Sequence, residues 1–497
     1  MKRSLVNPGY SKPMSDLCFL SATEMARLVR SKELSAVELT HAHLDRIERL
    51  NPQLNAYVQV DAEGAMLQAR TAEAAVLRGD ELGPLHGVPV SIKNCIGVKG
   101  LRQEAGTLQR KGVVAAADAV LVHRMRAAGA VILGTTNTPE LLMAWETDNL
   151  LYGRTNNPWS LDRTAGGSSG GEAAAIAAGL SAGGVGSDGG GSIRVPAHFC
   201  GICGLKPTPG RIPATGHFPP SGGPFAIIGV VGPMARTVAD TRLLFSVMAG
   251  YDDGDTSSAP VPVRSVPPAE LHKVRVAYFE DDGRTPVTPD TRAAVRRAAQ
   301  ALRDAGHEVV EFLPPQLERA RQLWWKFFGT AGGMILGPML AGHEAETSPF
   351  LKQYMEWATA DPAHTGESLL EAWNQRDQIR TEFFAAMREF PILLCPAAAI
   401  PAFRHGERSW SIAGREVSYL DAWSYTEFFN LLGNPGMVIP VSQTATDSDS
   451  NSNSKIGLPI GVQIVAPPWQ EELALAVAEA VESRIGGWQP PPLPECV

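Results

Sequence analysis

The sequence predicts an α/β fold, because strand and helix patterns alternate along the chain. Residues 85–93 form a short apolar run that ends on Lys93 and is typical of a buried strand. Residues 119–128 have a helical pattern that Gly129 closes, and residues 130–134 form a second apolar run. A strand, a helix and another strand in succession are typical of α/β architecture.

Three helices are expected before the first strand, within residues 20–80. Ser21 and Ser35 are each followed, three positions later, by a glutamate, which is the capping-box pattern of a helix start. A third helix is expected over residues 61–77, and Gly79 is suited to end it.

The second half of the chain continues the alternation. We expect strands over residues 273–278, 391–396, 436–440 and 460–465, helices over 289–305 and 471–485, and polar surface loops over 252–268 and 444–455. Residues 316–390 are helix-prone and carry six large aromatic residues, namely Trp324, Trp325, Phe327, Phe328, Trp357 and Trp373. Aromatic residues at such spacing are typical of a core, and some of them line ligand cavities.

Composition and charge exclude several classes of protein. The 497 residues are 44% hydrophobic and carry a formal net charge of −8, without a basic run. Nucleic-acid binding needs clustered Lys and Arg, so we expect no nucleic-acid partner. No apolar run has the length of a signal peptide or a membrane span, which predicts a cytoplasmic protein without a membrane partner.

Three patterns that resemble metal or nucleotide sites are better explained otherwise. The six cysteines are expected to be reduced, and the single CxxC at Cys200 and Cys203 lacks the further ligands of a zinc site. His41 and His43 face different directions on a helix. Residues 184–189 spell GxGxxG, but more glycines follow in place of a helix. We therefore expect no metal and no cofactor.

The most unusual stretch is residues 162–210, where two Gly/Ser clusters flank an Ala-rich segment that we expect to be a helix from Glu172. The first cluster spells GxSxG around Ser168, which is also the nucleophile elbow of α/β-hydrolases. That interpretation makes Ser168 the nucleophile and needs an acid and a histidine downstream. It leaves the second cluster, residues 187–194, without a role.

A second interpretation uses both clusters together with Lys93. Amide cleavage requires a nucleophilic hydroxyl, donors for the oxyanion and a proton for the leaving nitrogen. Ser192 follows residues 189–191, three glycines whose backbone amides can converge on a carbonyl oxygen. A buried Lys93, made neutral by desolvation, can then accept a proton through Ser168.

These residues resemble the amidase signature family, and the likeness extends over most of the chain. It is carried by the glycine-rich stretch and by six further segments: GPLHGVPVSIKN (83–94), GTTNTPE (134–140), GRTNNPW (153–159), CGLKPTPGRIP (203–213), NLLGNPGMVIP (430–440) and GLPIGVQIVAPP (457–468). The spacing of Lys93, Ser168 and Ser192 agrees with the family pattern as well.

The resemblance implies a Ser, cis-Ser, Lys triad. It makes Ser192 the nucleophile, Ser168 the proton relay after a cis bond to Gly167, and Lys93 the base. It assigns the oxyanion hole to the backbone amides of Gly189, Gly190, Gly191 and Ser192. It assigns supporting hydrogen bonds to Ser169, Asp188 and Arg194.

Two departures from the family pattern stand close to this site. Many members have Lys-Asp where this chain has Lys93 and Asn94, and a threonine where it has Gly189. The first change removes a carboxylate that would keep Lys93 charged. The second is expected to widen the oxyanion loop.

The resemblance also implies the architecture, a single domain over residues 1–497 with a large mixed, twisted β-sheet flanked by helices on both sides. Its parts are expected to be N-terminal helices over 20–80, a signature core over 81–250 and a helix-rich substrate cap over 316–390.

The resemblance places the substrate near four apolar residues, Leu142, Met143, Ala144 and Trp145. We therefore expect an amidase that cleaves the C–N bond of a small hydrophobic or aryl amide, an anilide or a carbamate (urethane) through an acyl-enzyme. One alternative is the glutamine-hydrolysing A-type subunit of a tRNA-dependent amidotransferase, which would need charged groups to hold glutamine. A non-catalytic binding protein and a homodimeric assembly also stay open.

Overall fold

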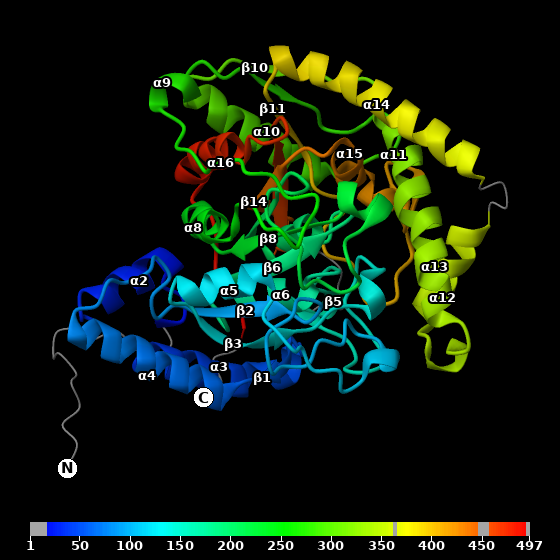
Figure 1. The fold of residues 1–497 in the computed structure, drawn as a ribbon. Coiled ribbons are helices and arrows are strands. Elements are labelled where there is room, and N and C mark those ends of the chain that lie inside the picture. Colours follow the sequence, from blue (N-terminus) through cyan, green and yellow to red (C-terminus); the bar gives the residue numbers. More distant parts are fainter. Residues whose placement is uncertain (1–16, 361–364, 446–456, 494–497) are drawn as a thin grey trace.

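The structure, a computed structural model, describes residues 17–360, 365–445 and 457–493. An 11-stranded sheet runs through the molecule, in the order β1-β3-β2-β6-β8-β7-β14-β15-β11-β9-β10 (Figure 1). Its strands are β1 Tyr57–Val60, β3 Val131–Thr136, β2 Pro89–Lys93, β6 Gly183–Asp188, β8 Val230–Ala235, β7 Cys203–Lys206, β14 Gly436–Gln443, β15 Pro459–Val465, β11 Ile392–Pro396, β9 Val276–Tyr278 and β10 Val309–Glu311. Parallel pairs such as β2 with β3 and antiparallel pairs such as β6 with β8 make the sheet mixed, as predicted.

Helices cover both faces of this sheet. One face packs against α5 Val120–Ala127, α8 Val238–Met248, α10 Pro289–Asp304 and α16 Glu471–Ile485. The other face packs against α6 Gly170–Ala177 and α7 Arg194–Cys200. Because side chains alternate along a strand, Val90 and Ile92 of β2 enter the first cluster, while Lys93 faces α6.

The N-terminal helices agree with the predicted caps. They are α2 Ala22–Arg30, α3 Ala36–Leu54 and α4 Ala62–Arg78. The Ser21 hydroxyl accepts from the Glu24 amide, and Ser35 and Glu38 complete a capping box. Gly79 ends α4 in the left-handed region, which glycine adopts without steric cost.

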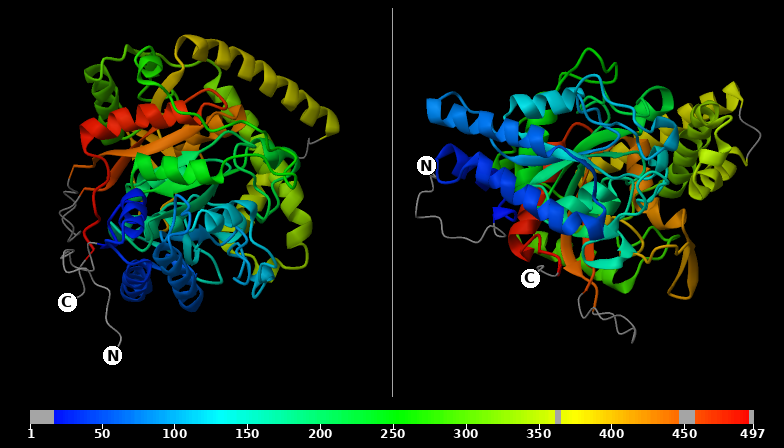
Figure 2. Two further views of the ribbon diagram at one scale, coloured as in Figure 1. Left: turned by 60° about the vertical axis from the view of Figure 1, so that its left-hand side comes forward. Right: turned by 90° about the horizontal axis from the view of Figure 1, so that it is seen from below.

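The helix-rich segment lies at one side of the sheet (Figure 2). It contains α11 Leu317–Trp325, α12 Ala331–Leu340, α13 Pro349–Thr359 and α14 Gly366–Glu389, with a π-helical turn over Lys326–Thr330 between α11 and α12. The remaining elements are α9 Pro268–Leu271, α15 Ser424–Leu432 and two small hairpins, β4 Asn156–Asn157 with β5 Ser160–Thr164 and β12 Ser409–Ile412 with β13 Arg415–Ser418.

The strands predicted from apolar runs are present as β2, β3, β9, β11, β14 and β15, and residues 252–267 form no helix or strand, as predicted. Most of the predicted 444–455 loop lies outside the described residues. Among the helices of the described residues, none is long and apolar enough to cross a membrane.

The GxGxxG stretch forms the central strand β6, which the sequence patterns did not reveal. Its glycines allow close packing on one face, since a Cβ at Gly186 would lie 2.7 Å from Ser169 Oγ and one at Gly184 would collide with the Glu172 carboxylate. A strand made of glycine has no apolar run and therefore no recognisable pattern.

Candidate active site

Lys93 ends strand β2 with its ammonium group wholly buried among three serines. Its Nζ lies 2.7 Å from Ser168 Oγ, 3.0 Å from Ser169 Oγ and 3.0 Å from Ser187 Oγ. The strand ends at this point, so its last side chain enters a gap between β6 and the start of α6 rather than the sheet interior. The structure thus brings together residues that the chain holds far apart.

Burial lowers the pKa of Lys93 to about 8, although the negative charges of Cys95, Asp188 and Glu172 oppose the shift. Glu172 gives little opposition at neutral pH, because burial raises the pKa of its own carboxyl to about 7. Asn94 faces elsewhere and holds the backbone of residues 102–105 through its amide. A lysine in this environment has a substantial neutral fraction at pH 7 to 8.

Ser168 and Ser169 lie immediately before α6. The Gly167–Ser168 peptide bond is cis, and Thr138 Oγ1 donates to the Ser168 carbonyl at 2.8 Å. Gly167 leaves no room for a side chain, because a Cβ there would lie 2.6 Å from the Ala144 carbonyl oxygen. Ala144 therefore contributes backbone packing behind the serine.

Asp188 and Arg194 support the second cluster from within. They form a buried bidentate pair, with Arg194 Nη2 at 3.0 Å from Asp188 Oδ1 and Arg194 Nε at 3.0 Å from Oδ2. Burial alone would raise the pKa of the Asp188 carboxyl, but the Arg194 guanidinium outweighs it and holds this pKa well below its usual range. The pair fixes the turn that carries Ser192 to the start of α7.

Ser192 is 8% exposed and lines a pocket, and its hydroxyl makes no hydrogen bond to any part of the chain that the structure describes. Its carbonyl accepts from the Ser169 amide at 3.1 Å, so the two Gly/Ser clusters are joined directly. The hydroxyl is available to a ligand in the pocket.

The predicted four-donor oxyanion hole needs one correction. The Gly191 amide donates to Asp188 Oδ1 at 2.7 Å and is therefore engaged. Within the described residues, the amides of Gly189, Gly190 and Ser192 donate to no other group. Three of the four predicted donors thus remain for a ligand.

Two tryptophans hold this loop from behind, a role that the sequence patterns did not reveal. Trp324 Nε1 donates to the Gly189 carbonyl and Trp145 Nε1 to the Gly190 carbonyl, each at 2.8 Å. In a trans peptide the C=O and N–H point in opposite directions, so the bond from Trp324 directs the Gly190 amide away from the helical segment. Trp145 was predicted to contact substrate, but it is buried behind the loop instead.

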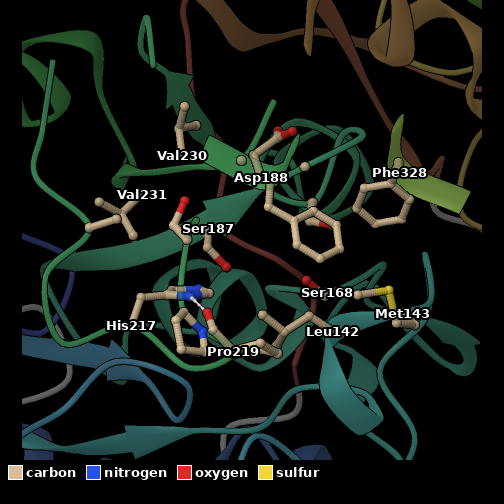
Figure 3. Close-up of a pocket in the computed structure, with 17 residues that line it drawn as sticks. Leu142, Met143, Ser168, Ser187, Asp188, His217, Pro219, Val230, Val231 and Phe328 are labelled. Carbon is tan, nitrogen blue, oxygen red and sulfur yellow. Dashed lines mark hydrogen bonds between the residues drawn. The ribbon is translucent and has the colours of Figure 1, made fainter. Parts of the chain in front are cut away.

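The pocket beside Ser192 is lined mainly by apolar groups (Figure 3). Of the four residues predicted to contact substrate, Leu142 and Met143 line it, whereas Ala144 and Trp145 do not. Of the aromatic residues noted in the helix-rich segment, only Phe328 lines this pocket. Much of the wall comes from a segment that carried no recognisable pattern: Ala214, His217, Pro219, Pro220, Ser221, Phe225, Gly229, Val230 and Val231.

The geometry offers a nucleophilic hydroxyl, free amide donors and a lysine of lowered pKa around one apolar pocket. These are the components that acyl transfer to water requires. No group of three or more metal-ligating side chains occurs among the described residues.

Comparisons with known proteins agree with this geometry. The family model described as Amidase matches residues 38–475. The indoleacetamide hydrolase of Bradyrhizobium diazoefficiens is 36% identical over 94% of this chain and 86% of its own length. The A-type subunit of the glutamyl-tRNA(Gln) amidotransferase of Salinispora arenicola is 35% identical over 97% of this chain and 100% of its own length. The solved structure of a bacterial aryl acylamidase of the amidase signature family superposes with a TM-score of 0.81, at 26% identity over 93% of this chain and 96% of that one.

Proposed function

The chain belongs to the amidase signature family, and we propose that it hydrolyses the C–N bond of small hydrophobic or aryl amides through an acyl-enzyme on Ser192. One observation carries the proposal. Buried Lys93 lies 2.7 Å from Ser168, and Ser192 stands unbonded in the pocket wall beside free backbone amides.

In the proposed reaction, neutral Lys93 accepts the Ser168 proton while Ser168 accepts the proton of Ser192. The Ser192 oxygen bonds to the carbonyl carbon, and the carbonyl electron pair moves to an oxygen that faces the amides of Gly189, Gly190 and Ser192. The tetrahedral intermediate then breaks its C–N bond, and the leaving nitrogen takes a proton from Ser168, which Lys93 replaces. Water attacks the acyl-enzyme through the reverse relay and releases the acid.

The pocket lining supports a hydrophobic or aryl substrate. It contains no Arg, Lys or Glu among the described residues, and its carboxylate, Asp188, is already paired with Arg194. Phe225 and Phe328 offer ring faces to an aromatic group. Two of the similar proteins are named for indoleacetamide and aryl substrates. Anilides and carbamates present the same carbonyl geometry and belong to the proposed class.

A glutamine-hydrolysing component of an amidotransferase is the second candidate, because one similar protein has such a name. Glutamine carries two charges next to its Cα, and burying them without partners is costly. The apolar lining therefore favours the amidase. Glutaminase activity above that on hydrophobic amides would reverse this preference.

The test is covalent labelling followed by a substrate panel. A fluorophosphonate probe should add one mass increment to the intact protein, located on Ser192, and Ser192→Ala should abolish both the adduct and the turnover of aryl amides. Ser221→Ala is the matched control, since Ser221 lines the same pocket away from Lys93. A protein that resists the probe and cleaves no amide, anilide, ester or carbamate would refute the proposal.

A further inference from the structure

Cys95 and His217 form a pair next to Lys93 that the proposed reaction does not use. The Cys95 thiol is wholly buried, and its Sγ lies 3.4 Å from His217 Nε2. His217 itself lines the pocket, close to Ser187 (Figure 3). The two residues come from loops far apart in the chain, so their meeting is a product of the tertiary structure.

The hydrogen bonds of His217 have a definite direction. Its Nδ1 lies 2.8 Å from the Pro219 carbonyl oxygen, which can only accept, so Nδ1 carries a proton. In the neutral ring Nε2 is then the acceptor, and it receives the proton of the Cys95 thiol. The thiol hydrogen thus points to His217, and the sulfur lone pairs face the other way.

The Ser187 hydroxyl lies between this pair and the lysine. Its Oγ is 3.8 Å from Cys95 Sγ and 3.0 Å from Lys93 Nζ. A hydroxyl has a single hydrogen, so when Ser187 donates to the sulfur its oxygen can only accept from Lys93. In the opposite orientation Ser187 would donate to the lysine nitrogen and occupy its lone pair.

A neutral lysine has two N–H groups and one lone pair, so the direction of each neighbour matters. Ser169 Oγ donates to the Ser187 carbonyl at 3.3 Å and therefore also accepts from Lys93. With Ser169 and Ser187 both accepting, the lone pair is left for the third neighbour, Ser168.

We propose that Cys95 and His217 are positioning residues, which hold the Ser187 hydroxyl as a donor to sulfur so that the lone pair of neutral Lys93 faces Ser168. The proposal rests on the proposed function, in which Lys93 receives a proton from Ser168.

The charges around the pair support the same arrangement. Burial alone would raise the pKa of the Cys95 thiol, but His217 and Lys93 outweigh it and lower this pKa. Burial would likewise lower the pKa of His217, but Cys95 raises it. Both shifts favour negative sulfur, which is a stronger acceptor for Ser187. The other charged groups that face Lys93 are the carboxylates of Asp188 and Glu172.

The test compares Cys95→Ala with Cys95→Ser on an aryl amide that the wild type cleaves. The alanine removes the acceptor, so kcat should fall roughly 10- to 100-fold while KM changes little. The serine restores a small group that accepts from Ser187 and donates to His217, and it should recover most of kcat. Both variants lose the negative sulfur that raises the pKa of Lys93, so both should move the acidic limb of kcat to lower pH.

Cys203→Ala removes another wholly buried thiol and controls for lost packing, and it should leave the pH profile unchanged. Thermal unfolding identifies any variant that fails to fold. Wild-type kcat and pH profile in Cys95→Ala would overturn the proposal, as would equal losses in the alanine and serine variants with an unmoved limb. A wild type that resists the fluorophosphonate and cleaves no amide refutes the proposed function instead, so the two failures are distinct.

Discussion

A side chain at position 189 is expected to damage the oxyanion loop through its contact with Phe328. A Cβ at Gly189 would lie 2.7 Å from Phe328 Cε2, whereas ordinary contacts begin near 3.4 Å. The space that the missing side chain was expected to open is therefore filled by a phenylalanine ring. Gly189→Ala must displace either that ring or the loop by roughly 0.7 Å.

The ring has little freedom to yield. Phe328 stacks on Trp324 at 4.7 Å between centroids and contacts the edges of Phe225 and Tyr354. Trp324 is itself tied to the Gly189 carbonyl, so a push on the ring returns to the loop. We expect the backbone amides to shift and kcat/KM to fall by roughly 10- to 100-fold, the range that misplacement of about 1 Å or loss of one oxyanion donor produces.

The assay is a double-mutant cycle on kcat/KM for an aryl amide. In a Phe328→Ala background the added methyl group has room, so Gly189→Ala should cost less than about threefold there. Gly337→Ala is the matched control, since a Cβ at that position of α12 meets no atom within 4 Å. Wild-type activity in Gly189→Ala, or the same loss in both backgrounds, would refute the reasoning.

Two further predictions concern charge. Because Lys93 must be neutral and its pKa is about 8, kcat/KM should rise from pH 6, where roughly 1% of the lysine is neutral, to a plateau above pH 8; a profile that falls steadily from pH 6 to 9 would contradict this. Arg194→Met leaves Asp188 buried without its partner and should lower the free energy of unfolding by about 3–5 kcal/mol, measured by urea denaturation. An unchanged denaturation midpoint would show that the pair does not stabilise the fold.

The sequence alone predicted the elements whose patterns are local. The caps at Ser21 and Ser35 act on amides within one helical turn, and the run ending at Lys93 reports its own burial. Family motifs added the positions of Ser168 and Ser192, which the structure brings to one pocket with Lys93 at hydrogen-bond distance from Ser168. The serine of the apparent nucleophile elbow, Ser168, contacts Lys93, and the pocket exposes Ser192 as well.

Tertiary structure alone decided the surroundings of these residues. Strand β6 forms because its glycines admit α6, and that requirement belongs to the contact rather than to any apolar pattern. Trp145 was expected in the pocket and instead holds the Gly190 carbonyl, since an indole N–H buried behind the loop needs an acceptor. His217 reaches Cys95 across more than a hundred residues of chain. Local sequence determines which elements form, whereas hydrogen-bond partners and pocket walls depend on distant segments that meet only after the sheet has assembled.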